Sequence, residues 1–194
     1  MRYFLLAVAA IFSSVAMATR MEGFGANYYD YDNLSVTRYV THNALVPDVI
    51  VSDGLFVMEF SNLADIAKTT GVAVNQDDRA SWICLSAKGI NYWFISDNEM
   101  GHGDLTTIAV ASDGKQKGCS SYGGDLRVKV KGIPLLGAAA NDLALTFPNE
   151  PGGNITQYCT DTKRYGDFTQ TNCLQYYFDH KTVEGVMISQ VTSN

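Results

Sequence analysis

The order of apolar and polar positions predicts a series of elements that begins near residue 48. The apolar stretch 48–60 predicts one or two strands. The next stretch, 61–71, predicts a short helix, because its apolar residues fall on one helical face. Ser61 is a suitable N-cap, and Gly71 is a typical helix end. Runs rich in β-branched and aromatic residues then predict three strands, ASWICLSA, NYWFIS and LTTIAVA.

The second half of the chain repeats this order. A strand and corner in LRVKVKGIPLLG precede a short helix in AAANDLALTF, and three strands follow, ITQYCTDT, CLQYYFD and VEGVMISQV. Matching positions lie between 75 and 84 residues apart: Leu63 with Leu143, Cys84 with Cys159, Tyr92-Trp93-Phe94 with Tyr176-Tyr177-Phe178, and Ile108 with Ile188. We interpret the pattern as a degenerate tandem duplication, the alternative being a chance likeness of two strand-rich halves.

The predicted fold class is therefore α+β. It consists of two related β-α-β-β-β units, 49–118 and 119–194, which form antiparallel sheet with the short helices on one face. A single unit of this size has only one helix to cover its apolar sheet face. Two units that pack together or join edge to edge bury more apolar surface and hide an exposed strand edge.

The first residues predict export. Residues 1–18 combine a cation at Arg2, an apolar run shorter than the ~20 residues of a bilayer span, and small residues before the expected cleavage site, which is typical of a secretory signal peptide. Residues 19–48 predict a loosely held, flexible leader with one short strand near 35–40. No later apolar run is long enough to span a membrane, so we expect a secreted or periplasmic protein. In such compartments the four cysteines would pair as disulfides, with three pairings open: Cys84, Cys119, Cys159 and Cys173.

The net charge and the absence of known site motifs reduce the classes of function that the sequence supports. Without residues 1–18 the chain holds 13 basic and 20 acidic residues, a formal charge of −7, and its basic residues are scattered. Nucleic acids and anionic lipids are bound by clustered Lys and Arg, so neither is an expected partner. The chain has no HExxH, GxSxG, Walker or GxGxxG pattern, and no cofactor is expected. The oligomeric state stays open.

One stretch, Tyr92–Ala111, gathers ionisable side chains between two apolar runs: Asp97, Glu99 and Asp104 surround His102. Carboxylates and an imidazole can form a mixed metal site. Alternatively, His102 can act as a general base oriented by Glu99 or Asp104, at the centre of a small exported hydrolase or metal-dependent enzyme. The third interpretation is the polar, glycine-containing tip of a hairpin. The sequence favours the hairpin tip, so neither a metal nor catalytic residues are expected there.

The helix followed by antiparallel strands, repeated in an exported chain with four cysteines, resembles the beta-lactamase inhibitory protein family and its single-unit, small-protein A-like relatives. The resemblance covers about residues 48–192 and includes segments such as GIPLLGAAANDLALTF and LQYYFDHKTVEGVMIS. It implies one disulfide in each unit. The implied pairs are Cys159 with Cys173 and Cys84 with Cys119. The second pair departs from the family pattern, because Cys84 has no near partner within its own unit.

The resemblance also implies a non-enzymatic binding protein, in its most specific form an inhibitor, that contacts another protein through a hairpin loop and an aromatic sheet face. The residues expected at such a surface are Asp97, Glu99 and His102 of the loop with Trp93 and Tyr177 as aromatic anchors. Since successive strand residues point to opposite faces, the middle residue of each aromatic triplet opposes its two neighbours. We therefore expect part of each triplet in the core and the other side exposed.

Overall fold

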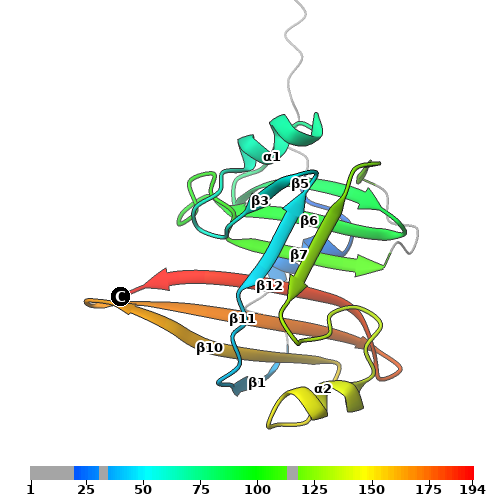
Figure 1. Ribbon diagram of the computed structural model, residues 1–194, viewed down its shortest axis with the longest axis vertical. Coiled ribbons are helices and arrows are strands. Elements are labelled where there is room, and N and C mark those ends of the chain that lie inside the picture. Colours follow the sequence, from blue (N-terminus) through cyan, green and yellow to red (C-terminus); the bar gives the residue numbers. More distant parts are fainter. Residues whose placement is uncertain (1–19, 31–34, 113–117) are drawn as a thin grey trace, which may run out of the picture.

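The computed structural model describes residues 20–30, 35–112 and 118–194, and the side chains of 161–163 are not described. The predicted signal peptide at 1–18 lies outside these residues. Strands dominate the described part of the chain, together with short helices, so the predicted mixture of helix and sheet is present (Figure 1).

The main element is a nine-stranded sheet (Figure 1). Its path runs from β1 (Thr37–Val40) through β10 (Ile155–Tyr165), β11 (Phe168–Asp179), β12 (Thr182–Ser193), β7 (Thr107–Ser112), β6 (Ile90–Asp97) and β5 (Ala80–Ala87) to β4 (Asn75–Gln76), and β8 (Ser120–Ser121) also pairs with β5. The pairs β1·β10 and β5·β8 are parallel, and the other pairs are antiparallel. The strands of both halves thus form one continuous sheet.

A second, three-stranded sheet lies in front of the large one in Figure 1, in the order β3 (Gly54–Phe56), β2 (Pro47–Val51), β9 (Leu126–Val130). With it lie α1 (Leu63–Thr70) at one end and α2 (Ala140–Thr146) at the other. Buried apolar residues of the small sheet and of both α-helices form one core with one face of the large sheet. Burial of this apolar surface is the main stabilising contribution to the fold.

The opposite face of the large sheet is covered by a 3₁₀ helix, η1 (Gly23–Asp30). Phe24 contacts Tyr177 edge-on with ring centroids 5.0 Å apart, and it also lies against Trp93. Gly25 sits so close to the Trp93 ring that a Cβ there would lie 2.5 Å from a ring carbon. The leader expected to be loosely held is therefore packed in its described part, because its aromatic residues bury themselves against an apolar face of the sheet. The strand expected near 35–40 is β1.

The two aromatic triplets alternate between faces as predicted. Tyr92 and Phe94 belong to the core on one face, whereas Trp93 belongs to the core under η1. The second triplet behaves in the same way: its outer residues pack on the first face and Tyr177 packs on the second. Both faces are covered, so no member of either triplet lies on an open aromatic surface.

Three strand pairs join the halves, one of them the short parallel pair of β5 with β8. β7 and β12 pair with Ile108 opposite Ile188. β2 and β9 pair with Val49 opposite Val128. The β7·β12 pair forms a seam in the large sheet, and the β2·β9 pair joins the strands of the small sheet.

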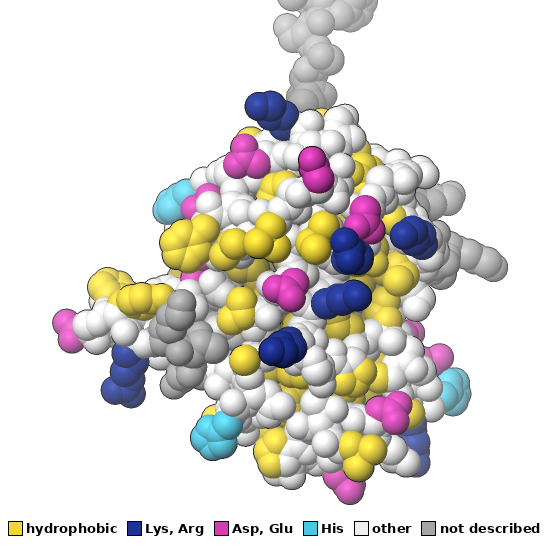
Figure 2. Space-filling model, viewed as in Figure 1, with side chains coloured by type: hydrophobic (Ala, Val, Ile, Leu, Met, Phe, Trp, Pro, Cys, Tyr) yellow, Lys and Arg dark blue, Asp and Glu magenta, His cyan; other side chains and the backbone are white. Residues whose placement is uncertain are grey.

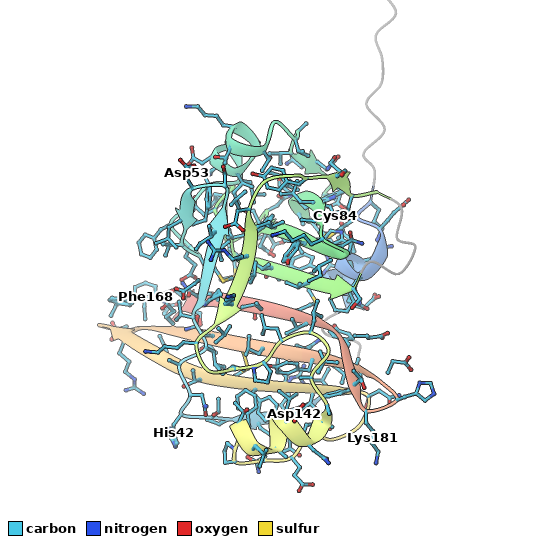
Figure 3. The ribbon with its side chains drawn as sticks, turned by 45° about the vertical axis from the view of Figure 1, so that its right-hand side comes forward. His42, Asp53, Cys84, Asp142, Phe168 and Lys181 are labelled. Atoms are coloured by element: carbon cyan, nitrogen blue, oxygen red, sulfur yellow. A yellow bond between two sulfur atoms is a disulfide. The ribbon has the colours of Figure 1, made fainter. Side chains whose placement is uncertain are left out.

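Two disulfides tie neighbouring strands together. Cys159 and Cys173 are opposite each other on β10 and β11. Cys84 of β5 is bonded to Cys119, the residue that precedes β8. Figure 3 marks Cys84 within the upper half of the molecule. Within the described residues, no helix is long and apolar enough to cross a membrane.

Candidate functional site

The loop 98–106, which connects β6 to β7, holds the beginning of α1. The Leu63 amide donates to the Gly103 carbonyl at 2.9 Å, and the Leu105 amide donates to the Ser61 carbonyl at 2.9 Å. The N-cap is Asn62 rather than Ser61: its side-chain oxygen accepts from the Ala64 amide, while its Nδ2 donates to Asp104 Oδ1 at 3.3 Å. The loop therefore supplies partners for backbone groups that a helix start leaves unpaired.

Gly103 is required by this contact. It has a φ of +100°, which favours glycine, and a Cβ at this position would lie 2.7 Å from Asn62 Nδ2. The hairpin-tip interpretation thus accounts for the sequence of the loop, because its glycine and Asp104 both serve the contact with α1.

The loop does not assemble the metal or catalytic group. Glu99 and His102 are exposed, and within the described part of the chain no hydrogen bond or ion pair joins either of them to Asp104. Among the described residues, no three His, Cys, Asp or Glu side chains are grouped closely enough to hold a metal ion.

The other predicted binding residues are also separated. Trp93 and Tyr177 are buried beneath η1 and present no surface to a partner. Asp97 is half-buried at the end of β6. Only Asp97 and Asp104, of all the predicted site residues, line the same cavity.

This cavity, which we name the β12 cleft, has a volume of about 630 Å³. It lies at the end of the seam. The pairing of β7 with β12 ends at Thr107, opposite Ser189, whereas β12 continues to Ser193. Its walls come from η1, the 59–60 segment, the residue before β5, the end of β6, the 98–106 loop, the start of β7, the β10–β11 hairpin and β12. They are formed by Tyr28, Glu59, Phe60, Arg79, Asp97, Met100, Gly101, Asp104, Thr106, Thr107, Tyr165, Gln170, Met187, Ser189, Gln190, Val191 and Thr192.

Glu59 takes the place of a neighbouring strand beside the end of β12. Its carboxylate accepts hydrogen bonds from the Thr192 amide at 2.7 Å, the Thr192 hydroxyl at 2.8 Å and Gln170 Nε2 at 2.8 Å. A further bond, at 3.1 Å, comes from the Gln190 side chain. Glu59 has a φ of +61°, a conformation that costs a non-glycine residue roughly 1 kcal/mol and is maintained here by these bonds.

Asp97, at the end of β6, also lines the cleft and is held by neutral donors. One of its oxygens accepts from the amides of Glu99 at 2.8 Å and Met100 at 2.9 Å, and the other accepts from the Tyr28 hydroxyl. Burial, followed by the hydrogen bond to Asp97, raises the pKa of Tyr28 well above its usual value, so the phenol stays a donor.

Large apolar side chains surround the cleft and remain exposed. The exposed fractions are 76% for Phe60, 56% for Met100 and 49% for Tyr165. Phe168 pairs with Tyr165 across the β10–β11 turn and is 48% exposed; Figure 3 shows it at the tip of that hairpin. In Figure 2, exposed hydrophobic side chains lie over the same hairpin end and the β3 region above it. We name Phe60, Met100, Tyr165 and Phe168 the apolar rim.

Sequence reasoning missed Glu59 and the apolar rim. The signal available for Glu59 was a single carboxylate inside the apolar run VMEF, where a strand would otherwise continue. The rim residues come from three segments far apart in the chain, and only the fold brings them together. No family model matches this chain, and neither a curated protein nor a solved structure matches it.

Proposed function

We propose that this protein is an exported, disulfide-bonded, non-enzymatic binding protein that recognises another protein through the β12 cleft and its apolar rim. The observation that carries the proposal is the rim itself: large apolar side chains are left exposed around one cavity while both faces of the sheet are covered. Exposed apolar patches next to a cavity are typical of interaction sites. The two disulfides support export.

The internal repeat supports the choice of this site. We propose that the two halves arose by duplication, because the two seams place matching residues opposite each other: Ile108 faces Ile188, 80 positions apart, and Val49 faces Val128, 79 apart. The contact between loop and helix recurs as well, since the Ala140 amide at the start of α2 donates to the Lys181 carbonyl.

Two of the places where the halves differ lie at the cleft. β11 and β12 run on to a tight turn at His180 and Lys181, whereas the corresponding strands β6 and β7 stop early and form the 98–106 loop. The β10–β11 hairpin is also longer: 14 residues separate Cys159 from Cys173, against 9 between the equivalent pair, Cys84 and Trp93. Both departures contribute walls of the β12 cleft. Divergence of this kind at a cavity is expected when only one half acquires a binding role.

An inhibitor of a hydrolase or of a cell-envelope enzyme is the most specific form of this proposal, following the resemblance to the beta-lactamase inhibitory protein family. In that form, the rim and the exposed loop residues Glu99 and His102 would enter the partner's surface. Enzymatic activity centred on Glu99, His102 and Asp104 is the competing hypothesis.

The test is capture of proteins from the envelope and culture fluid of the source organism on the immobilised mature protein, followed by titration with the purified partner. We expect Phe60→Ser to weaken binding at least tenfold. Leu145→Ser is the matched control, because Leu145 is an apolar residue of α2 that is 90% exposed and distant from the cleft. Equal binding by both variants would remove the cleft from the proposal. A hydrolytic activity of the pure protein that is lost in His102→Ala would favour the enzyme.

A further inference from the structure

We propose that the β12 cleft recognises an extended segment of its partner in which a Lys or Arg side chain lies next to an aromatic or aliphatic one. This inference rests on the proposed binding function and adds the chemistry of the ligand.

The charge of the cleft is the first argument. Among the described residues, three carboxylates line it, those of Glu59, Asp97 and Asp104, against the single cation Arg79. A cavity with this balance attracts positive charge, and its low-dielectric walls strengthen the attraction compared with open solvent.

The partners of these carboxylates are the second argument. Glu59 is bound by amide, hydroxyl and backbone donors, Asp97 by backbone amides and a tyrosine hydroxyl, and Asp104 by the Asn62 amide. Such donors fix the orientation of a carboxylate and leave its charge in place. The ion pairs found among the described residues, Arg127–Asp125 and His180–Asp179, do not involve the cleft. A cationic ligand would therefore meet carboxylates that are already oriented and not yet neutralised.

The apolar rim is the third argument. Phe60 and Tyr165 provide aromatic faces and Met100 a flexible thioether, all next to the acidic walls. Aromatic rings bind the stem and head of Lys or Arg through packing and cation–π attraction, and methionine adapts to irregular apolar groups. A cation alone would leave the rim exposed, and an apolar ligand alone would leave the carboxylates without a counter-charge. A segment that carries a cation next to an apolar side chain would neutralise the carboxylates and also cover the rim.

The experiment uses three labelled, end-blocked hexapeptides and the mature protein, with binding measured by fluorescence anisotropy at low and high salt. The probes are Gly-Phe-Lys-Phe-Lys-Gly, the same peptide with Glu in place of Lys, and the same peptide with Ser in place of Phe. We expect the first to bind at least tenfold tighter than either of the others, and its affinity to fall at high salt because ion pairs at an open cleft are screened.

Two variants locate the binding. Asp104→Asn removes one charge while its side-chain oxygen still accepts from Asn62, and we expect it to weaken the Lys peptide about threefold to tenfold. Glu184→Gln is the control, an exposed carboxylate near the opposite end of β12, and should leave the affinity unchanged. Equal affinity for the Lys and Glu peptides, or equal effects of the two variants, would overturn the inference. If the charge preference is absent but Phe60→Ser still abolishes capture of the natural partner, the binding function stands and only this ligand chemistry is wrong.

Discussion

Ile108 of β7 and Ile188 of β12 lie directly opposite each other in the seam that joins the two halves of the large sheet. Both side chains are buried in the same core. The seam therefore makes the core of one half depend on the other half.

We expect the two halves to unfold together. Ile108→Ala and Ile188→Ala should each lower the free energy of unfolding by about 2–5 kcal/mol, because each leaves a cavity in a closed core. The double variant should lose less than the sum of the two, since the residues are neighbours. Urea titrations followed by tryptophan fluorescence and by circular dichroism measure this. Trp82 and Trp93 both lie in the first half, so separate midpoints for the two signals would show that the halves are independent.

Gly103→Ala should destabilise the protein more than Gly89→Ala. Both glycines have positive φ, so each substitution costs roughly 1 kcal/mol in backbone strain. A Cβ at position 89 meets nothing within 4 Å, whereas one at position 103 is forced against Asn62 and disturbs the start of α1. Thermal unfolding of the two variants should therefore separate them, with Gly103→Ala melting lower. Equal melting temperatures would show that the contact between the loop and α1 contributes no stability.

The hydrogen bond from the Tyr29 hydroxyl to Asp77 should stabilise the protein in a pH-dependent way. Burial raises the pKa of the Asp77 carboxyl, but hydrogen bonds from Tyr29 and from the amides of Ala80 and Arg79 outweigh burial and hold that pKa below its usual 3.8. A lowered pKa in the folded state contributes stability above the unfolded pKa, and that contribution is lost as the pH falls through the folded value.

Tyr29→Phe should accordingly be less stable than the natural protein at neutral pH, and the difference should shrink below about pH 4. Tyr122→Phe, at a half-buried tyrosine outside this contact, should show no such dependence. Urea denaturation at a series of pH values gives the comparison. A stability difference that stays constant down to acid pH would contradict the role given to the Asp77 carboxylate.

Alkaline titration should show tyrosines that resist ionisation. Burial raises the pKa of Tyr28, Tyr29, Tyr158 and Tyr176 well above 10, assisted in the first two by hydrogen bonds to carboxylates. Their contribution to stability is complete below the unfolded pKa of about 10 and disappears as the pH rises above it. We expect ultraviolet tyrosinate absorbance to appear in two stages, with these four hydroxyls ionising only as the protein unfolds. A single titration near pH 10 in a folded protein would refute their burial.

Local chemistry in the sequence predicted much of the fold. Period-two alternation assigned Tyr92, Trp93 and Phe94 to the correct faces, and Gly71 ended α1 as expected in the left-handed conformation. The register of the sheet was not predicted. It places Phe94 opposite Ile108 and Leu174 opposite Ile188, so under the proposed duplication Phe94 would correspond to Leu174, four residues before Phe178. A shift by four residues is even, so each side chain keeps the same face of the sheet. The alternation of apolar and polar residues therefore does not reveal the shift.

The candidate site was less predictable, for a physical reason. The sequence drew attention to Glu99 and His102 because they are close in the chain, but their side chains are exposed and unconnected. The cleft depends on Glu59 reaching Thr192, 133 positions away, and on the place where β7 ends beside β12. Such long-range coincidences are decided by topology and strand length, and neither is encoded in a local pattern.

The position of β12 has a consequence for how the protein is made. This strand is the last of the described strands in sequence order, yet it lies in the interior of the large sheet between β11 and β7. While the chain is being synthesised, one edge of β7 stays unpaired until β12 has been made. A chain interrupted before β12 would keep that edge open, and the edge would then be available to β12 of another copy. Premature truncation should therefore produce exchanged dimers or aggregates rather than a folded half.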